Sequence, residues 1–248
     1  MKRIRTLTAP KDGNTEEQYE DAWALSEFSE FSEFSEFSEK HPVLAVADGA
    51  SAAVYAREWA ELLVAEFAHG APFPADDEVF WERVSVLGAQ WQKSVSTGAT
   101  TWYAQEKLPQ GSQASLLVLN FEPESRQLMA RAIGDVCLFL VVNDLLHYAF
   151  PLTKSRQFNT HPGLVATDPA ALKDRPDIIR FTAKLPATPV RLFVLSDAVA
   201  AWFLLEYERK RKPWNLIPSA TIFPAWLKGT RDSGALKNDD VTIIELEV

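Results

Sequence analysis

The chain has 248 residues, 47% of them hydrophobic and 24% charged, which is enough apolar material for one large domain or two small ones. Its formal net charge of −9 and its pI of about 5.0 argue against nucleic acid or an anionic membrane as a partner, although an acidic surface still admits metal cations. No apolar run approaches the roughly 20 residues that a membrane span needs, and the basic N-terminus lacks the apolar segment of a secretory signal. The only cysteine, Cys137, lies in the apolar run VCLFLVV and is expected to be a buried structural thiol. We therefore expect a cytoplasmic protein.

The first distinctive segment is the tandem repeat SEFSEFSEFSEFSE, which covers residues 26–39. A period of three would spread its four Phe side chains over half the circumference of an α-helix, or alternate them between the two faces of a strand. We expect a loop insert in a hairpin, over residues 26–40, because lengthening such a loop costs little free energy. The alternative is that the four rings are exposed and recognise a partner.

Short apolar strands are expected on both sides of this insert, at residues 21–25 and 43–47. In an antiparallel hairpin, the first residue of the first strand lies beside the last residue of the second. The hairpin therefore brings the carboxylates of Asp21 and Asp48 together, far from the insert.

Further aspartates recur at the ends of other predicted strands. Asp197 follows the apolar strand 190–195, and Asp239 and Asp240 precede the final strand at residues 241–248. Asp135 lies in the turn before the apolar run 136–142. Carboxylates gathered at one end of a β-structure need a counter-charge, and hard oxygen ligands suit Mg²⁺ or Mn²⁺. The alternative is that each Asp caps a helix or a turn.

The other expected elements follow from hydrophobic periodicity and turn residues. Amphipathic helices are predicted at residues 51–68 and 76–94, a helix after Asp197, and a partly helical segment at 219–230. Strands are predicted at residues 114–121, 127–133, 136–142, 178–182, 190–196 and 241–248. The segment 151–177 is rich in Pro, Thr and Asp and is expected to form a flap beside the site.

Six motifs stand in an order typical of one enzyme family: YEDAWAL, VADGAS, GSQASLLVL, AIGDVCLFLV, FVLSDAVA and NDDVTIIELEV. From about residue 10 to the C-terminus, the chain resembles the metal-dependent protein phosphatases (the 2C-type serine/threonine phosphatases), as a divergent, bacterial-like member. The resemblance implies an α+β fold, a four-layer αββα sandwich in which two antiparallel β-sheets are flanked by helices. It also implies that residues 1–248 form a single domain.

The resemblance further implies a centre of two Mn²⁺ or Mg²⁺ ions. Asp48 would bridge the ions, the carbonyl of Gly49 would bind one, and Asp197 and Asp239 would bind the other. Two such cations neutralise a phosphate ester and activate a water molecule for attack on phosphorus. The implied reaction is hydrolysis of phosphoserine or phosphothreonine in a phosphoprotein substrate, by an enzyme expected to be a monomer.

The family resemblance assigns roles to three more acidic residues. Asp21, with Glu20 beside it, would hold metal-bound waters, and Asp135 matches the position that helps to bind a third, weaker metal in some members. We count Asp21, together with the three aspartate ligands, among the catalytic residues.

The sequence departs from the family pattern where the substrate phosphate is held. Glu16 stands where the family has a phosphate-binding Arg, and Tyr19 replaces the Asn of its first motif. Lys11 or Arg5 is the candidate replacement cation. These changes favour an alternative function, a catalytically weak or inactive phosphatase-like module that binds or regulates. A phosphatase of small molecules is a third option.

Overall fold

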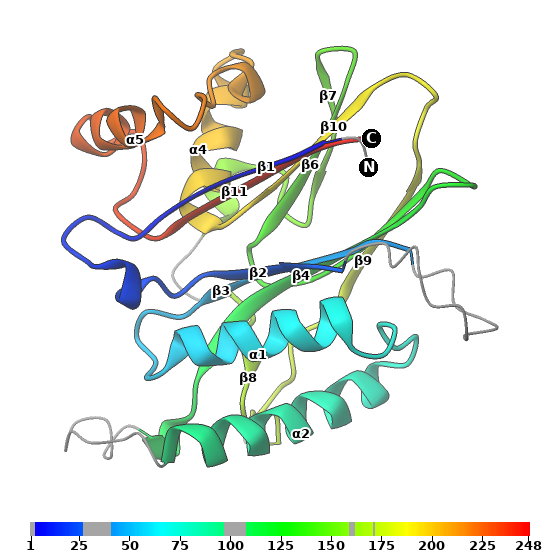
Figure 1. Cartoon of the computed structure of the whole chain (residues 1–248), viewed down its shortest axis with the longest axis vertical. Coiled ribbons are helices and arrows are strands. Elements are labelled where there is room, and N and C mark those ends of the chain that lie inside the picture. The colour runs from blue at the N-terminus through cyan, green and yellow to red at the C-terminus, as the bar shows by residue number, and fades with distance from the viewer. Residues whose placement is uncertain (1–2, 27–40, 97–107, 159–161, 171) are drawn as a thin grey trace.

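The computed structural model of the chain describes residues 3–26, 41–96, 108–158, 162–170 and 172–248. Two antiparallel β-sheets lie face to face, with helices packed outside both (Figure 1). This arrangement confirms the predicted αββα sandwich. In the part of the chain that is described, no helix combines the length and the apolar character that crossing a membrane would take.

The first sheet joins the two ends of the chain. Its strand order is β1-β11-β10-β6-β7. Its strands are β1 (Arg3–Ala9), β6 (Cys137–Val142), β7 (Leu145–Phe150), β10 (Val190–Leu195) and β11 (Val241–Glu247). The second sheet has the order β2-β3-β4-β5-β9, with the short β8 paired to β4. Its strands are β2 (Ala22–Leu25), β3 (Val43–Gly49), β4 (Gln113–Glu122), β5 (Gln127–Ile133), β8 (Val165–Ala166) and β9 (Ile179–Lys184).

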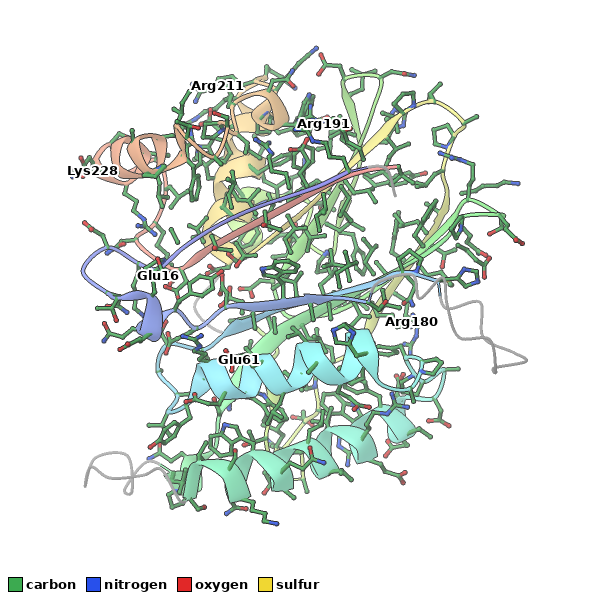
Figure 2. The ribbon with its side chains drawn as sticks, in the orientation of Figure 1. Glu16, Glu61, Arg180, Arg191, Arg211 and Lys228 are labelled. Atoms are coloured by element: carbon green, nitrogen blue, oxygen red, sulfur yellow. The ribbon has the colours of Figure 1, made fainter. Side chains whose placement is uncertain are left out.

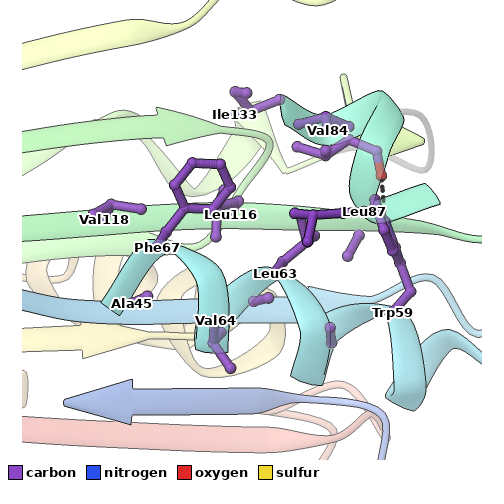
Figure 3. Close-up of a cluster of buried hydrophobic side chains, with 14 of the residues drawn as sticks. Ala45, Trp59, Leu63, Val64, Phe67, Val84, Leu87, Leu116, Val118 and Ile133 are labelled. Carbon is purple, nitrogen blue, oxygen red and sulfur yellow. Dashed lines mark hydrogen bonds between the residues drawn. The ribbon is translucent and has the colours of Figure 1, made fainter. Parts of the chain in front are cut away.

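The helices cover the outer faces of the two sheets (Figure 1). They are α1 (Ala56–His69) and α2 (Asp77–Ser96) on the second sheet, and α4 (Asp197–Glu208) and α5 (Phe223–Asp232) on the first. The buried face of α1 repeats at helical spacing, and its Trp59, Leu63 and Phe67 lie within the cluster drawn in Figure 3. The indole of Trp59 donates a hydrogen bond to the carbonyl of Val165, which fastens β8 to this helix.

Strand β4 shows how the sequence builds two cores at once. Leu116 and Val118 pack with the helices α1 and α2, whereas Leu117 and Leu119 pack between the two sheets. Successive side chains of a strand point to opposite faces, so a continuous apolar run is buried on both sides. The second strand of the site hairpin, β3, is buried on both sides for the same reason.

Strands β1 and β7 were absent from the sequence prediction. Strand β1 pairs in register with the last strand, Arg3 opposite Glu247 and Ala9 opposite Val241. Strand β7 follows a tight turn at Asn143 and Asp144, two residues that both have positive φ. Both strands lie at the edges of the first sheet, and their mixed polar composition shows no clean alternation.

Helix α1 begins later than the predicted residue 51. Residues 51–55 form turns, in which the N–H of Ala53 bonds to the carbonyl of Ala50. Tyr55 then has φ 53°, a left-handed conformation that cannot belong to an α-helix, so the helix starts at Ala56. The predicted flap at residues 151–177 holds a 3₁₀ turn at Ser155–Gln157 and the strand β8.

The hairpin around the repeat has the predicted pairing. Ala22 lies opposite Ala47 and Leu25 opposite Leu44, and the N–H of Ser26 bonds to the carbonyl of Val43. The predicted insert lies outside the described residues except at its first residue.

Candidate active site

The hairpin of β2 and β3 places the first two carboxylates of the candidate site. Because Ala22 pairs with Ala47, Asp21 and Asp48 occupy adjacent positions at the end of the hairpin. Asp48 is half-buried and lies within β3, opposite Ser115 of β4. Asp21 is buried, with 4% of its surface exposed.

The first turn of α4 brings a third carboxylate to this place. The backbone N–H of Asp197 donates to Oδ2 of Asp48 at 3.4 Å, across 149 residues of sequence. The N-terminus of a helix carries partial positive charge, so it favours an acidic side chain here. Ala198, the next residue, lies in the helix and has no left-handed conformation.

Asp239 joins the cluster from the loop before β11, and a lysine lies between it and Asp197. Nζ of Lys237 is 2.6 Å from Oδ2 of Asp239 and 3.7 Å from Oδ2 of Asp197. Sequence reasoning missed Lys237, because it belongs to none of the motifs. Its signal was a cation two residues before a predicted metal ligand.

Asp240, next to this cluster, fastens the N-terminal segment. Its two carboxylate oxygens accept the backbone N–H groups of Lys11 and Glu20, each at 2.7 Å. Asp240 is 4% exposed, and both hydrogen bonds are partly buried. The residue therefore holds the chain that leads into Asp21 against the start of β11.

Tyr19, from the altered first motif, contributes to the hydrogen bonds that hold Asp21. Thr242 donates its hydroxyl to Oδ2 of Asp21 at 2.7 Å, and the hydroxyl of Tyr19 bonds to the same threonine oxygen. Oδ1 of Asp21 is buried and has no hydrogen-bond partner among the described residues. A buried, unpartnered carboxylate oxygen is costly unless a cation or water binds it.

Asp135 is buried beside the same cluster. It follows Gly134, which has φ +96° and whose place a side chain could not take, since a Cβ there would lie 2.4 Å from Cβ of Ser115. The negative charge of Asp197 raises the pKa of Asp135. The carboxylate of Asp135, the fifth of the site, is therefore close enough to interact electrostatically with that of Asp197.

Gly49, which follows Asp48, lets the backbone of Glu20 and the residue Ala56 approach closely. A Cβ at this position would lie 2.7 Å from the carbonyl oxygen of Glu20 and 3.0 Å from Cβ of Ala56. The candidate phosphate-binding cation Lys11 lies on this side, with Nζ 3.3 Å from Glu20 and 3.0 Å from Oγ of Ser51. The other candidate, Arg5, bonds instead to Glu245 and to the carbonyl of Pro218.

Burial and mutual repulsion oppose ionisation of these carboxyl groups. Burial raises the pKa of Asp21 to about 8 and that of Asp135 to about 7, with further increases from Asp240 and Asp197 respectively. Burial, with the charges of Asp21, Asp197 and Asp135, also raises the pKa of Asp48 well above its usual range. The pKa of Asp197 is raised by burial although Lys237 opposes the increase. The carboxyl groups of the site therefore resist full ionisation, even with Lys237 beside Asp197 and Asp239.

The donor set fits a hard divalent cation, with carboxylate oxygens from three separate segments and the unpartnered Oδ1 of Asp21. Over the described ranges, however, no group of three or more His, Cys, Asp or Glu side chains is arranged to hold a metal ion. The ammonium of Lys237 contacts two of the predicted ligands instead.

Comparisons with known proteins agree with the fold. No protein-family model matches the sequence, and no curated protein matches it. Among solved structures, the serine/threonine phosphatase Stp1 from Staphylococcus aureus matches with a TM-score of 0.61 and 15% identity, covering 100% of this chain and 95% of that one. The photosystem II phosphatase PBCP matches with a TM-score of 0.57 and 16% identity, over 99% of this chain and 98% of that one.

A third similar structure is the PPM Ser-Thr phosphatase MsPP from Mycobacterium smegmatis, solved in complex with cacodylate. Its TM-score is 0.54 and its identity 15%, over 98% of this chain and 97% of that one. The chain thus has the fold of the PPM-type, or 2C-type, phosphatases, and the predicted resemblance is confirmed at the level of the fold.

Proposed function

We propose that this protein is a phosphatase that uses Mn²⁺ or Mg²⁺ to hydrolyse phosphoserine and phosphothreonine in proteins. The observation that carries the proposal is the meeting of Asp48, Asp197 and Asp239 from three distant segments at one end of the sandwich. Partly buried carboxylates that are gathered without matching cations lower stability, so their gathering favours a functional site. The phosphatases of the same fold support the choice of reaction.

In this proposal, Asp48, the carbonyl of Gly49, Asp197 and Asp239 hold two divalent cations. Bound there, the cations would neutralise the phosphate ester and lower the pKa of a water molecule that attacks phosphorus. Asp21 would hold metal-bound waters through its Oδ1, which has no hydrogen-bond partner among the described residues, while Thr242 fixes the orientation of its carboxylate.

Other residues of the chain complete the proposed site. Asp135 would help to hold a third, weaker cation. Lys11, whose Nζ lies beside Glu20 and Ser51, is the proposed contact for the substrate phosphate. We also propose that residues 1–248 form one domain, that the enzyme works as a monomer, and that it is cytoplasmic.

One assay tests the central claim. Turnover of a chromogenic aryl phosphate is measured with Mn²⁺, for the wild type and for Asp48→Asn. Losing a bridging ligand should lower metal-dependent turnover by a factor of about 10³, since cation stabilisation of the transition state is worth several kcal/mol. Equal background rates in both proteins would contradict the proposal. Phosphoserine, phosphothreonine and phosphotyrosine peptides then test the substrate class.

The rival function is a phosphatase-like binding or regulatory module without turnover. It is favoured by Glu16, an exposed acid on the 3₁₀ turn before β2, where the family has a phosphate-binding Arg (Figure 2). Arg57 does reach this turn, but it donates to the carbonyl of Glu16 and pairs with Glu61. Metal binding without turnover of any phosphopeptide would support this rival.

A further inference from the structure

Lys237 lies where the proposed function calls for a metal ion. Its ammonium contacts one carboxylate oxygen of Asp239 and approaches one of Asp197, the two residues proposed to share a divalent cation. Its side chain is 67% exposed, whereas those of the two aspartates are 24% and 21% exposed. A flexible stem thus carries the charge from solvent to the half-buried acids.

The loop that carries Lys237 is held in place on both sides. The side chain of Leu236 is buried, and the N–H of Asp239 bonds to the carbonyl of Lys237 at 3.0 Å. Arg231 donates to the carbonyl of Asp239 at 2.5 Å and to that of Pro10 at 3.1 Å. The backbone of Lys237 is therefore held next to the carboxylates, while its side chain can change conformation.

The neighbouring cations are engaged elsewhere. Lys11 contacts Glu20 and Ser51, and Arg231 bonds to backbone carbonyls rather than to carboxylates. Among the described residues, Lys237 is the cation in ion-pair contact with Asp197 and Asp239. Its positive charge also acts on Asp48 and Asp135. It is thus the main counter-charge of the metal-free cluster.

We propose that Lys237 is a built-in competitor for the divalent cation: its ammonium occupies one metal position between Asp197 and Asp239, and metal binding must displace it. The inference rests on the proposed metal-dependent function. It makes Lys237 a positioning residue that sets metal affinity, rather than a residue that touches the reacting atoms. A cation that enters beside Asp239 is repelled by the ammonium of Lys237. The lysine side chain must move back to solvent before the carboxylate oxygen of Asp239 can bind the cation.

The test is a titration with Mn²⁺, following free Mn²⁺ by electron paramagnetic resonance, without any substrate. Lys237→Met should bind Mn²⁺ about tenfold more tightly than the wild type, since about 1.4 kcal/mol of competition corresponds to a factor of ten. Lys237→Arg keeps a cation at the same place and should bind no more tightly than the wild type. Lys228→Met, on the exposed helix α5, removes the same net charge from an i,i+4 pair with Asp232 (Figure 2) and should change affinity less than twofold.

A second measurement separates competition from a merely structural role. In EDTA, Lys237→Met should lower the melting temperature, because the carboxylates lose their counter-charge. Saturating Mn²⁺ should remove that difference, so the increase in melting temperature caused by Mn²⁺ is larger in the variant than in the wild type. A structural lysine would lower both melting temperatures equally.

The possible outcomes are distinct. Mn²⁺ binding that is equally tight, or weaker, in Lys237→Met would overturn the inference while leaving the proposed metal site intact. If Lys228→Met increased the affinity for Mn²⁺ as much as Lys237→Met did, the effect would be one of net charge alone, and the inference would be overturned. The absence of Mn²⁺ binding in the wild type and in Lys237→Met alike would defeat the proposed function and this inference together.

Discussion

Glu245 and Asp21 are both buried acidic side chains, but their surroundings differ completely. Glu245 is 7% exposed and accepts hydrogen bonds from Nε of Arg5 and Nε of Arg191, each at 2.8 Å. Glu245 therefore links β1, β10 and β11. Arg191, labelled in Figure 2, also donates to the carbonyl of Trp214 in the 3₁₀ turn Pro213–Asn215. Asp21 accepts a hydrogen bond from the hydroxyl of Thr242, its Oδ1 has no hydrogen-bond partner among the described residues, and the charges of further carboxylates act on it.

A second paired acid shows the same pattern as Glu245. Glu206 is 3% exposed and pairs with Arg209 and Arg211 just after the end of α4. The fold thus supplies two guanidinium groups to each of these structural acids. Among the described residues, Lys237 alone forms ion pairs with the cluster of five aspartates, and it contacts only Asp197 and Asp239. In the proposed function, the cluster would be kept under-neutralised for a divalent cation, at a cost in the stability of the protein without that cation.

The largest expected consequence of this difference is a pH dependence of the metal-free protein. The folded pKa values of Asp21 and Asp135, about 8 and about 7, exceed their usual value of 3.8. The folded protein therefore holds more protons than the unfolded chain between these values, and stability falls as pH rises. We expect a loss on the order of 5 kcal/mol between pH 5.5 and 8.5, measured by urea unfolding in EDTA.

Two variants sharpen this prediction. Asp21→Asn cannot ionise, so its stability should fall less steeply with pH than that of the wild type. Glu206→Gln leaves the carboxylate cluster intact and should keep the wild-type slope. A free energy of unfolding that stays constant or increases with pH would show that burial does not raise the pKa values of these aspartates in the folded protein.

A smaller effect is expected at the paired acid. Glu245→Leu removes the counter-charge of Arg5 and Arg191 and should lower the free energy of unfolding by about 2–3 kcal/mol, a value reduced because both arginines are partly exposed. Turnover with Mn²⁺ per folded molecule should stay at the wild-type level. The matched control is Glu247→Leu, two residues further along β11, with an expected change within about 0.5 kcal/mol. A loss of turnover in Glu245→Leu at full folding would break the contrast between the two regions.

The smallest effect is expected from the repeat, which belongs to neither region. Deleting residues 29–38 should change the melting temperature by less than about 2 °C, because loop length at a hairpin tip contributes little to stability. Differential scanning calorimetry with and without Mn²⁺ measures this change. A collapse of the melting temperature would show that the Phe side chains are packed, and would contradict the loop prediction.

Much of the fold followed from local patterns in the sequence. The apolar runs at β3, β4, β6 and β10 and the helical spacing of α2 are strong signals, because burial on one or both faces imposes a period that a single segment displays. The hairpin pairing of Ala22 with Ala47 followed from connectivity alone. The predicted roles of the aspartates in metal binding stay predictions.

The sequence by itself determined which segments are buried and the order of the motifs that carry the aspartates. Only the tertiary structure decided that β1 is a strand, because its partner is at the other end of the chain, with Arg3 opposite Glu247. It likewise decided that Asp240 fastens Lys11 and Glu20 while Lys237 reaches Asp197 and Asp239. Electrostatic interactions between side chains act through space, between residues far apart in sequence, so the periodic patterns of a single segment cannot predict them.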